Sequence, residues 1–333
     1  MNLEYAKALR EFHGFAERCF VYFEALWEIL TAEKQRTRRF RRDLIAYNSL
    51  CEIFFPSLHP MVQTKKKRWW KGLQIAVLIY FLIGIALHFF QDKLIFRPVK
   101  LPADYRYQFS IPFQQIDLPV NTEKNLSIVQ FTVPDSLRKG IVLYFHGNRE
   151  NINRYASFAP GFTKNGYEVW MMDYPGYGKS TGKRTEKQLY EDALIFYKMA
   201  IGRVSAEHII FYGKSLGSGI AAQLATVRSC KRLILETPYY DFPAVFRRYL
   251  PLYPYDWILK YKIPTGENMQ YISAPIHIFH GTSDGVIAYR NARRLSKNFK
   301  PGDELITIKG GGHNNLFDYP LSVQKLDSLL RLP

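Results

Sequence analysis

Cysteine is scarce in this 333-residue chain, which has only three, at Cys19, Cys51 and Cys230. They form no CxxC pair and have no spacing suited to metal ligands, and no metal or organic cofactor is implied. Only Cys230 lies beyond residue 110, so a disulfide within that region is excluded. The stability of the region beyond residue 110 must therefore come from packing. We expect all three cysteines to be small buried apolar residues.

Internal repeats, low-complexity segments and nucleic-acid-binding motifs are also lacking, although the formal net charge is +17. The charge is spread out: residues 1–71 carry 14 Lys and Arg against 8 acids, and residues 72–333 carry 32 against 21. There are two dense basic runs, at 36–42 and 65–68, and neither sits in a nucleic-acid motif with interleaved stacking aromatics. We therefore expect no nucleic-acid partner, and an anionic membrane surface is the simpler partner for both runs.

A run of 20 residues without formal charge, residues 72–91, is long enough to cross a bilayer as a helix of about 30 Å. Twelve of these residues are Leu, Ile, Val or Phe. A buried core helix is the alternative, but a soluble helix that is apolar on every side is uncommon. We predict one transmembrane anchor here, with His88 as an interfacial residue and Trp69 and Trp70 in an aromatic belt.

The orientation of this anchor follows from the basic residues beside it. The cluster at residues 65–68 abuts the apolar run directly, which favours a cytoplasmic amino terminus and places the region after the run on the non-cytoplasmic side. The run begins too far into the chain for a cleavable signal peptide.

The first 60 residues repeat apolar side chains at helical spacing, first from Leu9 to Leu30 and then from Phe40 to Phe54. This pattern predicts an amphipathic helical hairpin over residues 1–60, ended by Pro56 and Pro60. One interpretation, which we favour, is that the hairpin packs on itself or lies on the membrane. The alternative is that it docks a protein partner.

Beyond residue 110, short apolar runs alternate with helical patterns, as in a mostly parallel sheet covered by helices on both faces. Strands are expected near 113–119, 126–133, 140–146, 167–173, 208–213, 231–236, 275–280 and 304–309, and helices near 151–165, 185–201, 216–228, 288–298 and 320–331. This order predicts one catalytic domain over residues 110–333, with eight strands and the α/β-hydrolase fold.

The central motif is Gly213-Lys214-Ser215-Leu216-Gly217, which joins an apolar strand to a helix. In this context GxSxG is a nucleophile elbow, in which a sharp turn exposes the serine beside a helix amino terminus. A phosphate-binding turn is the alternative, but neither GKS/T spacing nor GxGxxG is present. Ser215 is the predicted nucleophile.

A serine nucleophile needs a histidine to take its proton and an acid to orient that histidine. In this fold the acid and then the histidine follow the serine along the chain. Asp284 and His313 each follow an apolar strand and complete the predicted triad. Glu236 and Asp318 are alternative acids.

The oxyanion formed in acyl transfer needs backbone donors. We assign them to the N–H groups of Leu216 and of Asn148 in the His146-Gly147-Asn148 turn, with Arg149 as the alternative to Asn148. We interpret His146 as structural and Asp173 as a loop hydrogen-bonding residue.

A proline- and aromatic-rich segment, residues 238–273, interrupts the strand and helix alternation where this fold inserts a cap over the active site. Any single aromatic residue of this segment could simply pack on the domain. Taken together, these residues indicate an apolar substrate channel.

With these motifs in place, residues 72–333 resemble the membrane-anchored, bud-emergence-type (Bem-like) α/β hydrolases. The resemblance rests on the anchor running into FQDKLIF at 90–96 and on HGN at 146–148, DYPGYGKSTG at 173–182, GKSLGSG at 213–219 and HGTSD at 280–284. It implies Ser215, Asp284 and His313 as the triad, and relatives include enzymes that remove acyl groups from lipids or proteins. The chain departs from the family in HGNREN, where relatives commonly show HGNAGN.

These observations predict a single-pass membrane serine hydrolase of the esterase, lipase or thioesterase class, acting on acyl esters or thioesters through an acyl-serine intermediate. Its substrates are expected to be membrane-borne, because the anchor ends close to the first strand. The alternatives are a non-catalytic hydrolase-fold scaffold and a serine peptidase.

Overall fold

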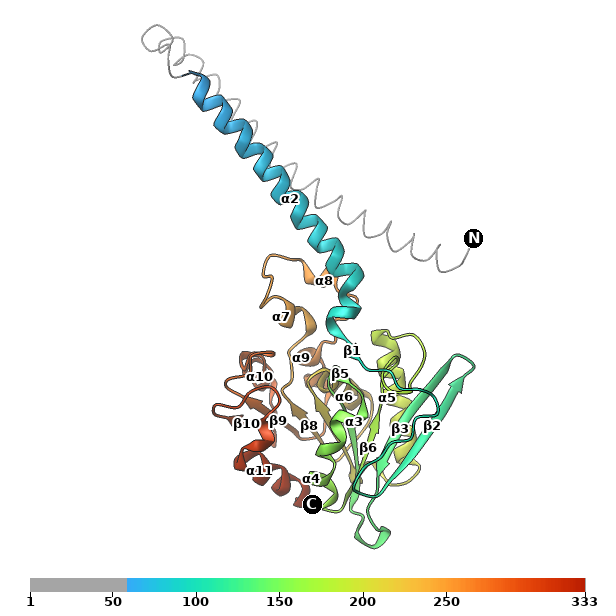
Figure 1. Cartoon of the computed structure of the whole chain (residues 1–333). Helices are drawn as coiled ribbons and strands as arrows, with labels where there is room; N and C mark the ends of the chain where they lie inside the picture. The colour runs from blue at the N-terminus through green and yellow to red at the C-terminus, as the bar shows by residue number, and fades with distance from the viewer. Residues whose placement is uncertain (1–58, 333) are drawn as a thin grey trace. The chain divides into compact units, whose positions relative to one another are not determined.

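The computed structural model describes residues 59–332, with side chains from Arg68 onward (Figure 1). The hairpin expected over residues 1–60 lies outside this range, apart from two residues at the start of helix α2 (His59–Ile95). The chain divides into two compact units, and the one that carries the sheet is Tyr80–Pro333. The carboxyl-terminal turns of α2 belong to this unit and pack into its core.

An eight-stranded sheet organises this unit, in the order β10-β9-β8-β7-β4-β6-β3-β2. Its strands are β2 (Phe113–Asn121), β3 (Lys124–Phe131), β4 (Gly140–Phe145), β6 (Tyr167–Met172), β7 (Ile209–Lys214), β8 (Arg232–Glu236), β9 (Ile276–Gly281) and β10 (Glu304–Ile308). Five pairings, from β6 through β4, β7, β8 and β9 to β10, are parallel, whereas β2 pairs with β3 and β3 with β6 antiparallel. The predicted fold class is confirmed.

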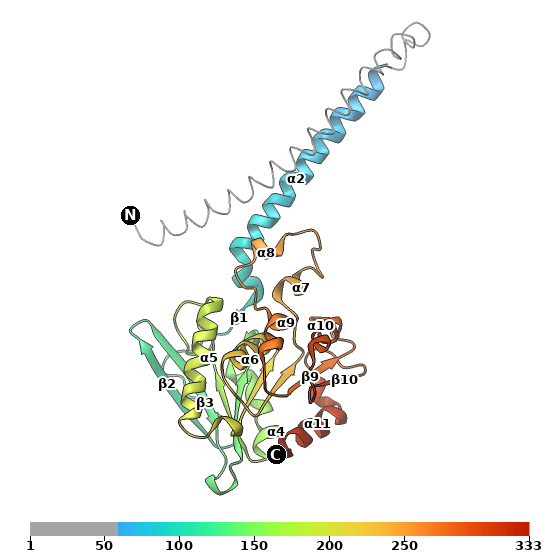
Figure 2. The same cartoon turned by 180° about the vertical axis from the view of Figure 1, so that it is seen from behind.

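Alternation along the strands divides the core into two layers. In β4, Ile141, Leu143 and Phe145 join the layer under α5 (Glu186–Ile201), α6 (Leu216–Val227) and α10 (Arg290–Leu295). Val142 and Tyr144 join the opposite layer, under α3 (Ile152–Tyr155), α4 (Pro160–Thr163) and α11 (Pro320–Arg331). Both faces of the sheet are therefore buried, and the helices that cover them can be followed in Figure 1 and Figure 2.

The prediction of one continuous helix over residues 151–165 is wrong. The segment forms α3, a 3₁₀ turn at Ala156–Phe158, and α4, which begins at Pro160. Proline has no N–H for a helical hydrogen bond and is tolerated only in a first turn, so a new helix begins there. Similarly, the helix expected over 288–298 ends as a 3₁₀ turn at Ser296–Asn298.

Two features were not predicted by strand patterning. Strand β1 (Arg97–Pro98) follows α2 directly and pairs in parallel with β5 (Arg149–Glu150). The cap segment contains three short helices, α7 (Phe242–Phe246), α8 (Tyr255–Ile258) and α9 (Thr265–Asn268). Residues 80–95 of α2 contact this segment through several hydrogen bonds.

Candidate active site

Ser215 lies in a sharp turn between β7 and α6 with φ 51° and ψ −115°, a strained conformation for a residue with a Cβ. The two glycines of the motif make the turn possible. A Cβ on Gly217 would lie 2.0 Å from the carbonyl oxygen of Phe145, and one on Gly213 would lie 2.5 Å from the carbonyl oxygen of Gly217. The spacing in GxSxG thus reflects close backbone approach around the serine.

The structure brings the three predicted triad residues together. His313 Nε2 lies 3.0 Å from Ser215 Oγ, and His313 Nδ1 lies 2.8 Å from Asp284 Oδ2. A carboxylate can only accept, so Nδ1 carries the proton and Nε2 is left to accept from the serine hydroxyl. This is the tautomer that a general base requires.

The loops after β9 and β10, which carry Asp284 and His313, are joined by backbone hydrogen bonds. Thr282 N–H donates to the Ile308 carbonyl at 3.0 Å, and Ser283 N–H donates to the Gly311 carbonyl at 2.9 Å. This approach requires Gly281, because a Cβ there would lie 2.1 Å from the Gly311 carbonyl oxygen. The acid and the histidine are therefore held in register by backbone contacts.

Asp284 is buried but well supplied with donors. The backbone N–H groups of Val286 and Ile287 each donate to its Oδ1 at 2.8 Å, and His280 Nε2 lies 3.4 Å from its Oδ2. Burial alone raises the pKa of Asp284, but contacts with His280 and His313 and the hydrogen bond from Ile287 N–H outweigh it and hold the pKa well below its usual range. Asp284 thus stays ionised at neutral pH. Our sequence interpretation gave His280 no role, although it belongs to the same HGTSD motif.

The two alternative acids take other positions. Glu236 is fully buried, forms an ion pair with Lys214, and accepts a hydrogen bond from Tyr212 Oη at 2.7 Å. Asp318 is exposed, and its carboxylate makes no hydrogen bond to His313 within residues 59–332. Of these three candidate acids, Asp284 alone makes a hydrogen bond with His313.

The predicted oxyanion donors lie on neighbouring segments. The close approach of Gly217 to the carbonyl oxygens of Phe145 and His146 places the start of α6 against the His146-Gly147-Asn148 turn. Among the described residues, none accepts a hydrogen bond from the backbone N–H of Leu216 or Asn148. Arg149, the alternative, is exposed and belongs to β5.

His146 and Asp173 brace this turn. His146 Nδ1 lies 2.7 Å from the Gly147 carbonyl oxygen, and its Nε2 lies 3.4 Å from Asp173 Oδ1. Asp173 accepts from Ile152 N–H at 3.0 Å and from Tyr107 Oη at 2.9 Å. Both residues thus make the structural contacts that we expected.

The aromatic residues of the cap segment divide between interior and surface. Tyr239, Tyr255 and Tyr261 are buried, whereas Tyr249 and Trp257 are exposed. The interior members pack on the domain.

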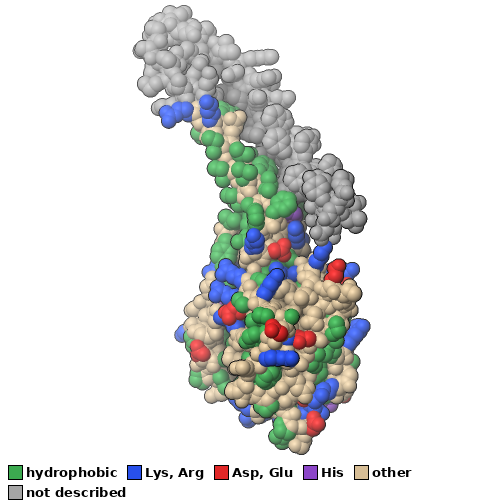
Figure 3. Space-filling model, turned by 45° about the vertical axis from the view of Figure 1, so that its right-hand side comes forward, with side chains coloured by type: hydrophobic (Ala, Val, Ile, Leu, Met, Phe, Trp, Pro, Cys, Tyr) green, Lys and Arg blue, Asp and Glu red, His purple; other side chains and the backbone are tan. Residues whose placement is uncertain are grey.

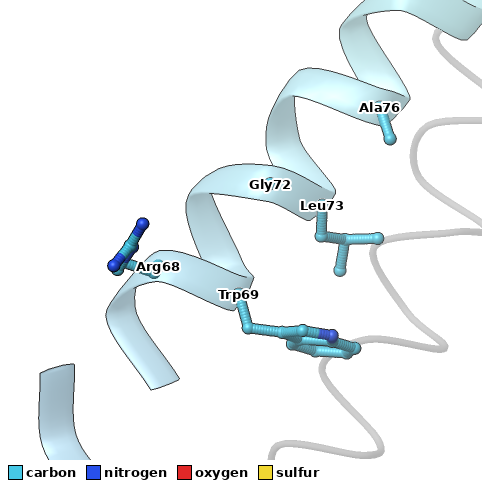
Figure 4. A pocket seen from close by; sticks show the side chains of 5 residues that line it. All are labelled: Arg68, Trp69, Gly72, Leu73 and Ala76. Atoms are coloured by element: carbon cyan, nitrogen blue, oxygen red, sulfur yellow. The ribbon is translucent and has the colours of Figure 1, made fainter. Parts of the chain in front are cut away.

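A separate surface hollow lies on α2, lined by Arg68, Trp69, Gly72, Leu73 and Ala76 (Figure 4). All five come from one helix, and none of them is a nucleophile or an acid. The hollow therefore adds nothing to the triad chemistry.

Comparison with known proteins agrees with this fold. A family model described as serine aminopeptidase, S33 matches residues 137–265, which contain Ser215 but end before Asp284. By fold the chain is an α/β hydrolase.

Two curated relatives illustrate the similarity. Alpha/beta hydrolase domain-containing protein 17C of Xenopus tropicalis is 29% identical over 193 residues, which are 57% of this chain and 61% of the relative. Protein 17B of Homo sapiens is 30% identical over 193 residues, 56% of this chain and 65% of the relative. The chain thus spans about three fifths of the length of the curated relatives it matches.

Solved structures show the same fold at lower identity. An esterase from Pyrococcus furiosus has a TM-score of 0.55 and 18% identity, covering 70% of this chain and 98% of the esterase. An α/β hydrolase from Vibrio vulnificus has a TM-score of 0.54 and 19% identity, covering 66% and 80%. The fold, the family model and the relatives together support a hydrolase enzyme, and the narrower bud-emergence-type resemblance stays a prediction.

Proposed function

We propose that this chain is a membrane-anchored serine hydrolase that cleaves carboxylic esters or thioesters of acyl chains. One observation carries the proposal: on a strained elbow, Ser215 Oγ lies 3.0 Å from His313 Nε2, while His313 Nδ1 lies 2.8 Å from an ionised Asp284. In this proposal Ser215 is the nucleophile, His313 the general base and Asp284 the orienting acid.

The reaction follows from these positions. Ser215 Oγ attacks the substrate carbonyl carbon as His313 Nε2 takes the hydroxyl proton, and the amides of Leu216 and Asn148 donate to the new oxyanion. When the intermediate collapses, the bond to the alcohol or thiol breaks and His313 gives its proton to that leaving group. Water then attacks the acyl-Ser215 ester with the same base, which releases the carboxylic acid and restores the serine.

A serine aminopeptidase is the second candidate, because the matching family is described by that activity. The same triad serves both reactions, and the two differ in the bond that is cleaved. A non-catalytic scaffold is the third candidate, and the complete hydrogen-bonded triad argues against it.

Fluorophosphonate labelling and turnover separate these candidates. We expect the wild-type protein to be labelled at Ser215 and to hydrolyse short p-nitrophenyl esters faster than aminoacyl p-nitroanilides. Ser215→Ala should abolish labelling and turnover, while its melting temperature stays within a few degrees of wild type. Absence of labelling in the folded wild-type protein would refute the enzyme, and preference for the anilides would favour the peptidase.

The membrane part of the proposal rests on α2. An 18-residue window within Arg68–Ile95 has a mean hydropathy of 2.3, with 17% of that window buried, so by length and composition the helix is able to cross a membrane. Figure 3 shows hydrophobic side chains along its described part. We keep a single-pass anchor, a cytoplasmic amino terminus and a non-cytoplasmic catalytic unit as proposals.

One face of this helix, within residues 80–95, belongs to the protein interior. Tyr80 stacks on Tyr253 at 4.5 Å and donates to the Leu252 carbonyl at 2.8 Å. The ring of His88 is buried, with Nδ1 2.8 Å from the Ile258 carbonyl oxygen, so our interpretation of His88 as an interfacial residue is wrong. The sequence pattern missed this face because the hydropathy of a segment does not show which side meets protein.

The position of Tyr80 has a consequence for the cap segment. Tyr80 lies near the middle of the apolar run 72–91, so an inserted helix would carry the adjoining cap residues towards the lipid. Three of these side chains are already apolar and exposed, with Leu252 81%, Tyr249 59% and Trp257 49% accessible. We infer that this tip meets the bilayer and that acyl substrates reach the site from the membrane.

A matched pair of substitutions tests this surface. Leu252→Asp should slow hydrolysis of an ester embedded in anionic vesicles about ten-fold and leave hydrolysis of a dissolved short ester unchanged. Leu137→Asp is the control, because Leu137 is also exposed (63%) but lies on a separate 3₁₀ turn at Asp135–Leu137. Equal vesicle rates for both variants would contradict the membrane contact. Protease digestion of sealed vesicles tests the side on which the catalytic unit lies.

A further inference from the structure

The loop that carries the proposed oxyanion donor Asn148 is joined to the chain segment that leaves α2. Arg97 N–H donates to the Asn148 carbonyl at 2.9 Å, and Val99 N–H donates to the Glu150 carbonyl at 3.1 Å. These bonds form the short β1–β5 pair, which has no other strand beside it in the part of the chain that the structure describes. A two-residue pair of this kind is weak alone, so side-chain contacts must hold it in place.

Two asparagine side chains supply these contacts. Asn148 Nδ2 donates to the Ile95 carbonyl at 2.7 Å, and Asn151 Nδ2 donates to the Val99 carbonyl at 3.0 Å. Ile95 is the last residue of α2, where carbonyl groups lack a partner within the helix. The Asn148 amide therefore caps the apolar helix and ties it to the oxyanion loop.

The helix end is itself a firm support. Ile95 and Phe96 are both buried, and Phe96 packs on Tyr261 with 4.8 Å between ring centroids. One turn earlier, Gln91 is fully buried, and its Oε1 accepts from Lys260 N–H at 2.7 Å. The loop is thus attached to a part of α2 that the cap segment holds on another side.

The orientation of the Asn148 N–H is fixed from both neighbouring peptide groups. The preceding carbonyl, that of Gly147, contacts His146 Nδ1 at 2.7 Å, and within a planar trans peptide the N–H points the opposite way. The following carbonyl, that of Asn148, accepts from both Arg97 N–H and Tyr177 Oη. The N–H itself is left for a ligand, as preorganised oxyanion stabilisation requires.

We propose that the Asn148 side chain is a positioning group for catalysis, which uses the last turn of α2 to hold the Asn148 N–H towards the developing oxyanion. This rests on the proposed serine-hydrolase function. The apolar helix is then a part of the catalytic scaffold as well as an anchor. The same contacts bear on the sequence HGNREN at 146–151, in which Glu150 stands where relatives commonly have glycine. Glu150 has φ 59°, a left-handed conformation that glycine adopts more readily. The β1–β5 pair and the side chains of Asn148 and Asn151 hold Glu150 in this conformation.

The test uses the full-length protein in detergent with Asn148→Ala and Asn148→Asp, which remove the donor and keep the backbone N–H. An aspartate has nearly the same size but cannot donate to the Ile95 carbonyl when ionised. We expect kcat for a dissolved p-nitrophenyl ester to fall about ten- to a hundred-fold with KM within two-fold, because oxyanion contacts act in the transition state. A trifluoromethyl ketone, which forms a tetrahedral adduct with Ser215, should bind more weakly by the same factor.

Asn153→Ala is the matched control. Asn153 is an exposed residue of α3 whose Nδ2 lies 3.2 Å from Tyr105 Oη, and it should keep wild-type kcat. Wild-type kcat in both Asn148 variants would overturn the positioning role. A fall in kcat together with a rise in KM and a lower melting temperature would also overturn it, because that combination indicates general unfolding. Failure of the proposed function is a different result, since wild-type protein would then show no Ser215-dependent turnover or labelling.

Discussion

The buried ion pair between Lys214 and Glu236 yields a sharp prediction, because both residues adjoin Ser215 and Glu236 was an alternative catalytic acid. Their side chains are 4% and 0% exposed, and the Ser215 N–H donates to the Glu236 carbonyl at 2.9 Å. Glu236→Gln would leave the Lys214 ammonium buried, with the Phe158 ring 5.0 Å away as its other partner. We therefore expect a loss of stability with little specific effect on the chemistry.

The magnitude follows from the burial of both groups. Removing one member of a buried pair costs about 3–5 kcal/mol, which for a unit of this size lowers the melting temperature by roughly 6–20 °C. Lys214→Met should cost a similar amount, because it leaves the Glu236 carboxylate unpaired. The double variant Lys214→Met/Glu236→Gln removes both charges and should recover most of the loss.

The assay combines thermal melting in detergent with ester turnover measured well below every melting temperature. Folded Glu236→Gln should keep kcat within about ten-fold of wild type. If its kcat fell by about a thousand-fold or more with an unchanged melting temperature, Glu236 would be the catalytic acid and the structural ion-pair interpretation would be refuted. A double variant as unstable as the two single variants added together would show that the charges do not interact.

Three further predictions follow from the site and the core. Asp284→Asn should lower kcat by about 10³–10⁴-fold through the wrong histidine tautomer. Because the folded-state pKa of Asp284 is depressed, its ionised form stabilises the protein above about pH 4, and this stability is lost as the pH falls. The melting temperature of Asp284→Asn should therefore fall less than that of the wild type between pH 7 and pH 3. Gly217→Ala should destabilise the fold by about 3 kcal/mol or more, since the new Cβ meets the Phe145 carbonyl at 2.0 Å, whereas Gly161→Ala, with nothing within 4 Å, should be neutral or stabilising in thermal melts. Cys230, which we expected to be buried, is half-buried, and desolvation raises the pKa of its thiol to about 12; iodoacetamide at pH 8 should therefore alkylate Cys230 more slowly in the folded protein than in urea, as read by mass spectrometry, and equal rates would contradict this.

The parts of the fold predicted correctly are those with local physical causes. Continuous apolar runs such as Ile209–Tyr212 predicted buried parallel strands, and the glycines around Ser215 predicted a turn that only small residues permit. The order of Ser215, Asp284 and His313 could be read because each follows a strand, and parallel strands end at one edge of the sheet. The structure brings these three side chains into hydrogen-bond contact.

The features that were missed depend on contacts between distant residues. The β1–β5 pair joins Arg97 to Arg149 through two residues on each side, which is too short for a pattern in either segment. The inward face of α2 exists because His88 meets the carbonyl of Ile258, 170 positions later. The break at Pro160 is different, because its cause, a proline within the helical pattern, is local to the sequence.

The contacts between residues 80–95 of α2 and the cap segment limit where the chain can be truncated. Deleting residues 1–91, the natural choice from hydropathy, would remove Gln91 and leave Lys260 N–H without its acceptor inside the protein. It would also uncover the faces of Tyr253 and Ile258 that α2 covers. A truncated enzyme has to begin at or before Tyr80, so it keeps an apolar helical edge and will need detergent or lipid during purification. Solubility and an intact active site are therefore competing aims in this protein.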